Sequence, residues 1–271
     1  MRTVIGLAIV LLWSIGPLYW IVQASLRTDN ALFNHTLAPK PSEVTLKSFV
    51  DVFDMYPFAM YFRNSIIVSL GAVAVGMAVT IPGAYAFTRL RFPLKKPLFY
   101  YVILSLFFPW IVLIIPLYNI YTKLGMMNTF AGVIIAYTVV ISPLCLWLLR
   151  GFFSTALDKD IEGAAMIDGC TLMGAFFRVI LPLSMPAVVA TATFTFLVAW
   201  NEFIWVFLLT SGEAKRTAVV GIHYLMGSDV ARDYNALLAA VLMTSLPPVL
   251  FYSFLQGFLT KAFATAGGTK Y

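Results

Sequence analysis

A single acidic side chain, Glu202, lies within the long apolar run from Ser184 to Leu209. An acid at the centre of a membrane-spanning helix costs about 2.5–3.5 kcal/mol, so such a residue is a candidate for a functional site. Asn201 beside it offers a donor and an acceptor, and the indoles of Trp200 and Trp205 offer flat apolar faces. We therefore expect Trp200, Asn201 and Glu202 to face a polar path and at least one of them to contact a solute there. The alternative is that they hold this helix to a partner subunit or lie near the outer interface.

A second informative stretch runs from Asp158 to Pro186. Asp158 and Asp160 favour a helix N-terminus, because acids cap the free amides and complement the helix dipole there. Gly169 is suited to end this helix, and apolar residues then recur at the spacing of a second helix. The small residues at 163–165 permit close approach of another backbone. The apolar face of this stretch predicts a docking surface, and a helix lying on the lipid interface is the alternative.

The composition indicates that lipid covers much of the surface. Hydrophobic residues make up 61% of the 271 residues and charged residues 11%. A soluble domain carries about 25% charged residues, so this chain has too few to cover a surface that faces water. The net charge of +6 fits basic loops facing the cytoplasm, and no basic stripe with interleaved aromatic residues indicates nucleic-acid binding.

Apolar runs of the length needed to cross a bilayer, roughly 20 residues, predict about six spanning helices. We expect them at about Val4–Leu26, Asn64–Thr88, Leu98–Leu117, Phe130–Leu149, Ser184–Leu209 and Ala236–Leu259. The first run is too long for the core of a signal peptide, and no A-x-A-like cleavage site follows it, so we expect it to be retained. Most runs contain proline, which predicts kinked helices.

The distribution of Lys and Arg predicts that both termini lie in the cytoplasm. The strongest signal is the short segment Arg89–Lys96, which is rich in basic residues. On this topology the loop at about 150–183 is cytoplasmic, and the loop at about 210–235 is outside. Cys145 falls within a span and Cys170 in a loop, so neither a disulfide framework nor a metal site is expected.

Residues 162–169 read Glu-Gly-Ala-Ala-Met-Ile-Asp-Gly, and Leu181-Pro182 follows farther along. This pattern resembles the EAA loop of permease subunits in bacterial ABC importers, whose sugar branch often has Glu-Glu-Ala-Ala-x-x-Asp-Gly. The glutamate of the Glu-Ala-Ala triplet is replaced here by Gly163, while the preceding Glu162 remains. The replacement leaves open which carboxylate, if either, makes the polar contact to the ATPase.

The resemblance extends over most of the chain. Further segments that are similar to sugar permeases, and to the maltose-type (MalG-like) second permease in particular, are Phe176–Leu183, Ala199–Phe203, Pro116–Thr129 and the tail Leu259–Lys270.

The resemblance implies an all-α, polytopic protein with the type I ABC importer permease fold, forming a single permease domain over residues 1–271. It implies half of a translocation path for a sugar or glycoside, completed by a second homologous permease. Two ATPase subunits and an extracytoplasmic solute-binding protein are the other implied partners. Because the chain has no GxxxxGK[ST] loop, ATP and Mg are expected on the ATPase and no cofactor on this chain. The implied location is the cytoplasmic membrane of a bacterium or archaeon.

The resemblance also assigns roles to individual residues. Those implied to couple to the ATPase are Glu162, Gly163, Ala164, Ala165, Met166, Asp168, Gly169 and Pro182. In the outer loop, position alone predicts contact with the binding protein at Gly212, His223 and Gly227, and an ordinary polar connection is the alternative.

Other classes of function find less support in the sequence. HExxH, GxSxG and acid-rich metal clusters are absent, so an enzyme is not expected. An ABC permease for a non-sugar solute remains an alternative. A secondary transporter driven by an ion gradient would show more charged residues in its spans and repeated halves. A membrane scaffold without a transport role is a third possibility.

Overall fold

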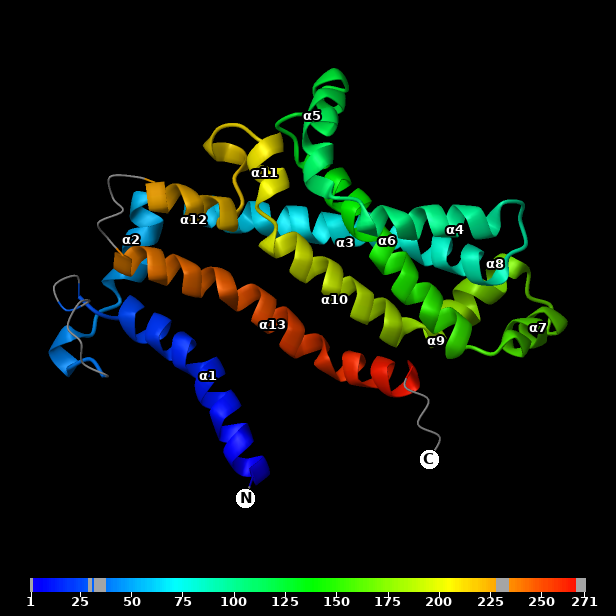
Figure 1. Ribbon diagram of the computed structural model, residues 1–271, viewed down its shortest axis with the longest axis horizontal. Helices are drawn as coiled ribbons and strands as arrows, with labels where there is room; N and C mark the ends of the chain where they lie inside the picture. The colour runs from blue at the N-terminus through cyan, green and yellow to red at the C-terminus, as the bar shows by residue number, and fades with distance from the viewer. Residues whose placement is uncertain (1, 29–30, 32–37, 228–233, 267–271) are drawn as a thin grey trace. The chain divides into compact units, whose positions relative to one another are not determined.

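The computed structural model describes residues 2–28, 31, 38–227 and 234–266 (Figure 1). Within them the regular structure is helical, apart from one isolated bridge between Arg27 and Val44. Three helices are long and apolar enough to cross a membrane: α3 (Phe58–Arg89), α6 (Phe130–Thr155) and α13 (Tyr234–Ala266). Counting each of two bent helix pairs as one span raises the number to five. The prediction of an all-α, polytopic membrane protein is confirmed.

The first predicted span corresponds to α1 (Arg2–Ser25), whose described apolar part is Ile9–Ser25. Nearly all its described side chains before Val22 are exposed within the chain, including Trp13 and Trp20. An apolar helix that the rest of the chain leaves uncovered is suited to a span that faces lipid. Each of the six predicted apolar runs thus coincides with helical structure.

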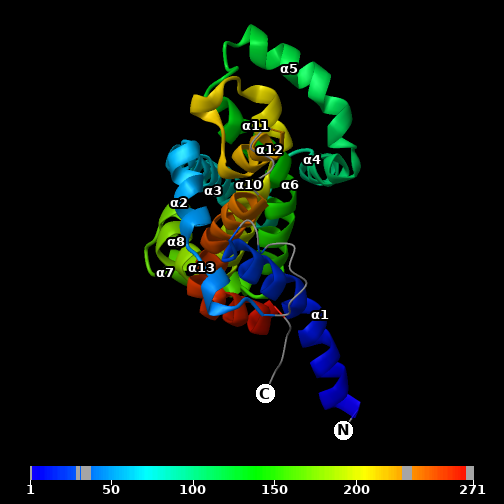
Figure 2. The ribbon, with the colours of Figure 1, turned by 90° about the vertical axis from the view of Figure 1, so that its left-hand side faces the viewer.

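The third predicted span, Leu98–Leu117, is not one straight helix. Four helical segments replace it: α4 (Lys95–Leu104), η3 (Ser105–Phe107), η4 (Trp110–Leu113) and α5 (Ile114–Lys123). The two halves, Lys95–Phe107 and Trp110–Lys123, differ in direction by 95°. Figure 2 shows α5 running in a different direction from α4. Pro109 lies at the break, where its missing N–H prevents a continuous helix.

The fifth predicted span, Ser184–Leu209, is also interrupted. It comprises α10 (Met185–Asn201) and α11 (Ile204–Leu209), separated at Glu202 and Phe203. Before it, Leu172–Leu183 meets α10 at 73°, at the turn that the prolines at 182 and 186 predict. The buried Ser184 hydroxyl donates to the Ile180 carbonyl at 2.6 Å, which satisfies a carbonyl next to the bend.

The contacts of the chain fall into two compact units, and the chain passes from one to the other within α3, between residues 215 and 216, and within α13. The first unit holds residues 1–65 and 216–247. Its core contains α2 (Lys47–Met55), the start of α3, α12 (Ala218–Gly227) and the start of α13. Gly221 of α12 lies so close to Tyr61 of α3 that a Cβ there would stand 2.4 Å from Tyr61 Cδ2.

The described part of the predicted outer loop, residues 210–227, is therefore largely helical and not an irregular polar connection. It contains the short η6 (Glu213–Lys215) and the apolar α12, whose Ala218, Val220 and Leu225 are buried. The sequence interpretation missed α12 because a helix of ten residues is too short to register as a span.

The second unit holds residues 66–215 and 248–271. In it α6 packs against α10, where the Cys145 and Thr195 side chains meet at 3.3 Å. The rings of Phe196 and Phe251 stack with centroids 4.0 Å apart, which brings the second part of α13 against α10. Toward residue 89 of α3, a cluster of apolar side chains joins α3, α6 and the segment before α10. This cluster is the platform on which the loop at 150–183 rests.

Candidate functional site: the short helix after α6

The loop between α6 and α10 contains two helical segments, as the sequence predicts. The first is α7 (Lys159–Ile167), and the Asp158 carboxylate accepts the Asp160 N–H at 3.2 Å at its N-terminus. Gly169 ends it with φ +91°, a backbone conformation that L side chains rarely adopt. The Cys170 N–H then donates to the Ala165 carbonyl at 3.0 Å. The break between the two helical segments is thus set by Gly169.

The second segment begins at Thr171, whose hydroxyl accepts the Gly174 N–H at 3.1 Å. It continues through α8 (Leu172–Ala175), a π-helical turn at Phe176–Ile180 and α9 (Leu181–Leu183). Phe176 and Ile180 are buried in the cluster with Ala84 and Tyr85 of α3 and with the end of α6. Pro182 is exposed, at the turn into α10.

The helix α7 has two distinct faces. Gly163, Ala164, Met166, Ile167 and Asp168 are exposed, and Ile167 is 88% exposed. Ala165, by contrast, is buried at 7%, and Ile161 packs against the cluster below. An apolar side chain as exposed as Ile167, next to small residues, is suited to contact with another protein. We call the surface made by residues 163, 164, 166, 167 and 168 the coupling face, after the contact to an ATPase that the sequence resemblance predicts for this loop.

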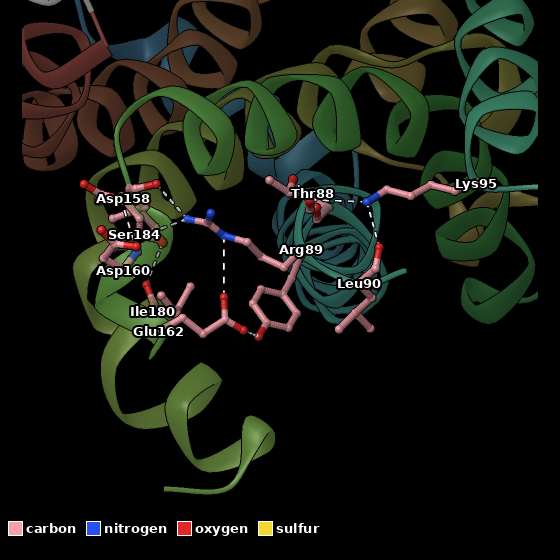
Figure 3. Close-up of polar contacts among 12 residues, drawn as sticks. Thr88, Arg89, Leu90, Lys95, Asp158, Asp160, Glu162, Ile180 and Ser184 are labelled. Atoms are coloured by element: carbon pink, nitrogen blue, oxygen red, sulfur yellow. Dashed lines mark hydrogen bonds and ion pairs between the residues drawn. The ribbon is translucent and has the colours of Figure 1, made fainter. Parts of the chain in front are cut away.

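Glu162 lies on the inward side of α7, not on the coupling face. Its Oε1 accepts a hydrogen bond from the Tyr85 hydroxyl, and its Oε2 lies 3.7 Å from Nε of Arg89. The side chains of Arg89 and Glu162 are 5% and 12% exposed, respectively. Figure 3 shows Arg89 of α3 pointing across to Glu162 of α7. Because water is largely excluded, this pair is screened less than an exposed one.

Arg89 also binds the backbone that leads into α7. Its guanidinium donates to the Leu157 carbonyl at 2.7 Å and to the Asp158 carbonyl at 3.4 Å (Figure 3). One side chain therefore contacts both the backbone that precedes α7 and the first turn of α7. The sequence interpretation used Arg89 only as a sign of topology, and Tyr85 not at all. Nothing local signals their partnership, because 77 residues separate Tyr85 from Glu162.

The end of α3 is further stabilised by Lys95. Its Nζ donates to the carbonyls of Thr88 at 3.2 Å and Leu90 at 2.7 Å (Figure 3). A cation at the last carbonyls of a helix satisfies acceptors that lack an intrahelical partner and complements the dipole. The segment of basic residues after α3 thus has a local structural role in addition to any role in topology.

Gly163 stands in open space. A Cβ at this position would meet no atom within 4 Å, and its φ is not positive. The glutamate that the resemblance leads one to expect here would therefore fit. Its absence leaves Asp168 as the carboxylate of the coupling face, while Glu162 is engaged inside the chain.

The candidate path residues differ in exposure. Trp200 is 1% exposed and its ring stacks on Phe196 at 5.6 Å. Glu202 accepts the N–H groups of Ile204 at 2.8 Å and Trp205 at 3.0 Å, and so caps α11. Asn201 is exposed. Trp200 and Glu202 thus have contacts within this chain, whereas Asn201 is exposed, and all three stay candidates for the path.

The three residues predicted to contact a binding protein are exposed but not on one loop. Gly212, with φ +74°, belongs to the second unit, whereas His223 and Gly227 lie on α12 in the first. The remainder of the predicted loop, at 228–233, lies outside the described residues, as does the end of the tail from 267. Among the described residues no group of three or more His, Cys, Asp or Glu side chains could hold a metal ion.

Long apolar helices, two bent helix pairs and a short exposed helix between α6 and α10 are features that a membrane transport subunit would have. The family described as binding-protein-dependent transport system inner membrane component matches residues 72–265. The chain belongs to this family. It is a multi-pass membrane protein, and its relatives are transport permeases rather than enzymes.

Individual relatives match nearly the whole chain. The inner membrane ABC transporter permease protein YcjP of Escherichia coli K12 is 33% identical over 272 residues, covering 98% of this chain and 94% of its own length. The sulfoquinovosyl glycerol transport system permease protein SmoH of Agrobacterium fabrum is 32% identical, with coverage of 98% and 92%. The trehalose/maltose transport system permease protein MalG of Thermococcus litoralis is 30% identical, with coverage of 98% and 95%.

A solved structure shows the same fold. A chain from the crystal structure of a bacterial ABC transporter involved in the import of the acidic polysaccharide alginate matches with a TM-score of 0.82. The match covers 95% of both chains at 19% identity. The resemblance to a carbohydrate ABC importer permease that the sequence indicates is thus confirmed at the level of family and fold.

Proposed function

We propose that this chain forms half of the translocation path of an ATP-driven importer for a sugar or glycoside. The family and the named relatives support an importer subunit, and several relatives are named for transport of sugars or sugar derivatives. A second homologous permease would complete the path, and an extracytoplasmic binding protein would deliver the solute. On this assignment the chain lies in the cytoplasmic membrane, with both termini in the cytoplasm.

The observation that carries the coupling role is the exposure of Ile167 on a short, firmly anchored helix. Burying an apolar side chain of this size contributes about 1.5–3 kcal/mol, so leaving it in water favours a partner that covers it. The cluster beneath α7 fixes the helix, so a force applied to its outer face reaches the spanning helices. We assign the coupling face to a cleft in an ATPase subunit, where ATP and Mg are bound.

The test is co-purification of the chain with its ATPase. Ile167→Glu places a charge where the apolar contact forms, and the open position of Ile167 means that the fold tolerates the change. We expect Ile167→Glu to lose the ATPase on purification in mild detergent, and the matched variant Ile167→Leu to retain it. Met173→Glu, at another exposed apolar position in the same loop, controls for a general effect of charge. Normal ATPase recovery with Ile167→Glu would contradict the assignment.

The solute class has its own test. Proteoliposomes that contain the assembled importer should accumulate a labelled sugar only when ATP and the binding protein are both supplied. Accumulation of a non-sugar solute instead, with none from a panel of mono- and oligosaccharides, would favour the alternative importer.

A further inference from the structure

The contacts of Arg89 join two elements that are distant along the chain. Arg89 lies in the last turn of α3, a helix of 32 residues, and α7 follows α6. The covalent neighbours of α7 are α6 and α8, so no backbone connection runs directly from α7 to α3. The side chains of Tyr85, Arg89 and Glu162 supply that connection.

We propose that Tyr85, Arg89 and Glu162 form a latch that makes α7 and the C-terminal end of α3 move as one body. The inference rests on the proposed function, in which a partner displaces α7 through its coupling face. Glu162 is then a positioning residue inside the permease and does not contact the ATPase. Displacement of α7 passes directly to a spanning helix, without first passing along the chain through α6 or α8.

The geometry makes the latch more than an incidental surface pair. Arg89 contacts the carbonyls of Leu157 and Asp158 as well as the Glu162 carboxylate, so it fixes both the position and the orientation of α7. The Tyr85 ring packs on Phe176 with centroids 4.6 Å apart, so the same helix turn also contacts the segment that follows α7. A buried charge left without its partner is strongly unfavourable, which keeps the two sides together during movement.

The inward position of Glu162 argues against its standing in for the glutamate that is absent at position 163. If Glu162 took over the missing contact to the ATPase, its side chain would need to turn outward and leave Arg89 without its carboxylate. The inward arrangement instead assigns the two tasks to different faces. The coupling face binds the partner, and Glu162 transmits the movement.

The experiment separates movement from docking by using graded variants in the assembled transporter. Glu162→Gln keeps an oxygen acceptor for Tyr85 but removes the charge opposite Arg89, and Tyr85→Phe removes one hydroxyl. Asp160→Asn is the matched control, because Asp160 is an exposed acid on the same helix. Amide hydrogen exchange of α7 reports its attachment, and solute imported per ATP hydrolysed reports coupling.

In Glu162→Gln we expect exchange of α7 amides to quicken about tenfold, in line with the loss of one charge-assisted contact. Solute imported per ATP should fall about tenfold, since a movement of α7 no longer carries α3 with it to the same extent. Tyr85→Phe should shift both readouts in the same direction by less, and Asp160→Asn should shift neither. Co-purification of the ATPase should be retained in all three variants.

Unchanged exchange together with unchanged coupling in Glu162→Gln and in Glu162→Ala would overturn the latch. Loss of the ATPase with unchanged α7 exchange would also overturn it, by showing that Glu162 contacts the ATPase directly. Failure of the proposed function would look different, because the unsubstituted chain would then bring down no ATPase at all. If the Glu162→Ala variant does not fold, α7 exchange and coupling in the milder Tyr85→Phe variant decide the question.

Discussion

The side chains of Asn201 and Glu202 serve opposite sides of one helix break. Asn201 Nδ2 donates to the Leu197 carbonyl of α10 at 2.8 Å, whereas Glu202 accepts the Ile204 N–H of α11 at 2.8 Å. A break within an apolar span leaves backbone groups that lipid does not satisfy, so side chains must do so. Glu202 therefore satisfies amides that the break leaves free, whereas Asn201 shares a carbonyl within α10, so their variants should behave differently.

Glu202→Ala should destabilise the protein by about 1 kcal/mol or more, because it removes the cap of α11. Glu202→Gln should lose less, since its amide oxygen still accepts the N–H groups of Ile204 and Trp205. The melting temperature of the purified protein in detergent measures the difference. If Glu202→Gln keeps its melting temperature but loses uptake, the charge itself acts on the solute, as the sequence interpretation proposes.

Asn201→Ala should leave the melting temperature nearly unchanged, because Asn201 is exposed and its bond duplicates a helical acceptor. If Asn201 faces the path, the KM for uptake should rise while the co-purified ATPase is unaffected. Asn201→Gln serves as the control, because it retains the amide one methylene farther out. An unchanged KM in the alanine variant would remove Asn201 from the candidate path.

Gly221→Ala should destabilise the first unit by about 1–3 kcal/mol, because overpacking forces neighbouring groups to shift. The added methyl would meet the Tyr61 ring at 2.4 Å, and Tyr61 is itself 1% exposed and cannot easily move. Gly227→Ala on the same helix is the control, since a Cβ there meets nothing within 4 Å. Equal melting temperatures for the two variants would contradict the close packing of α12 on α3.

Gly169→Ala should cost about 1–2 kcal/mol, because a side chain is strained at a positive φ. The strain acts on the turn after α7, so we expect a lower ratio of solute imported to ATP hydrolysed as well as a lower melting temperature. Gly163→Ala is the matched control, at an open helical position where alanine is favourable. A Gly169→Ala variant with the thermal stability and coupling of the unsubstituted chain would show that this turn adapts.

Several features follow from the sequence because they depend on local chemistry. Apolar runs predict the spans, since lipid tolerates few other residues, and Asp158 and Gly169 predict the start and end of α7. The breaks within the spanning helices are harder to predict from the sequence. Pro109 marks one bend, but whether a proline kinks a spanning helix or interrupts it depends on neighbours that can satisfy the freed backbone groups.

The side chains of the candidate site could be predicted by type but not by direction. The sequence places Glu162 in the loop between α6 and α10, and only the tertiary structure shows that it points toward Tyr85 and Arg89 of α3. The sequence likewise places Glu202 in an apolar span, and only the fold shows that it caps α11.

By itself, therefore, the sequence determined that this is a multi-pass membrane protein and where the short helix α7 begins and ends, because hydrophobic length and turn residues act locally. The tertiary structure decided which face of α7 is free, because that choice depends on Arg89 in a separate helix. Long-range pairs of this kind leave no periodic pattern in one sequence, since each residue is compatible with its own helix whether or not its distant partner is present.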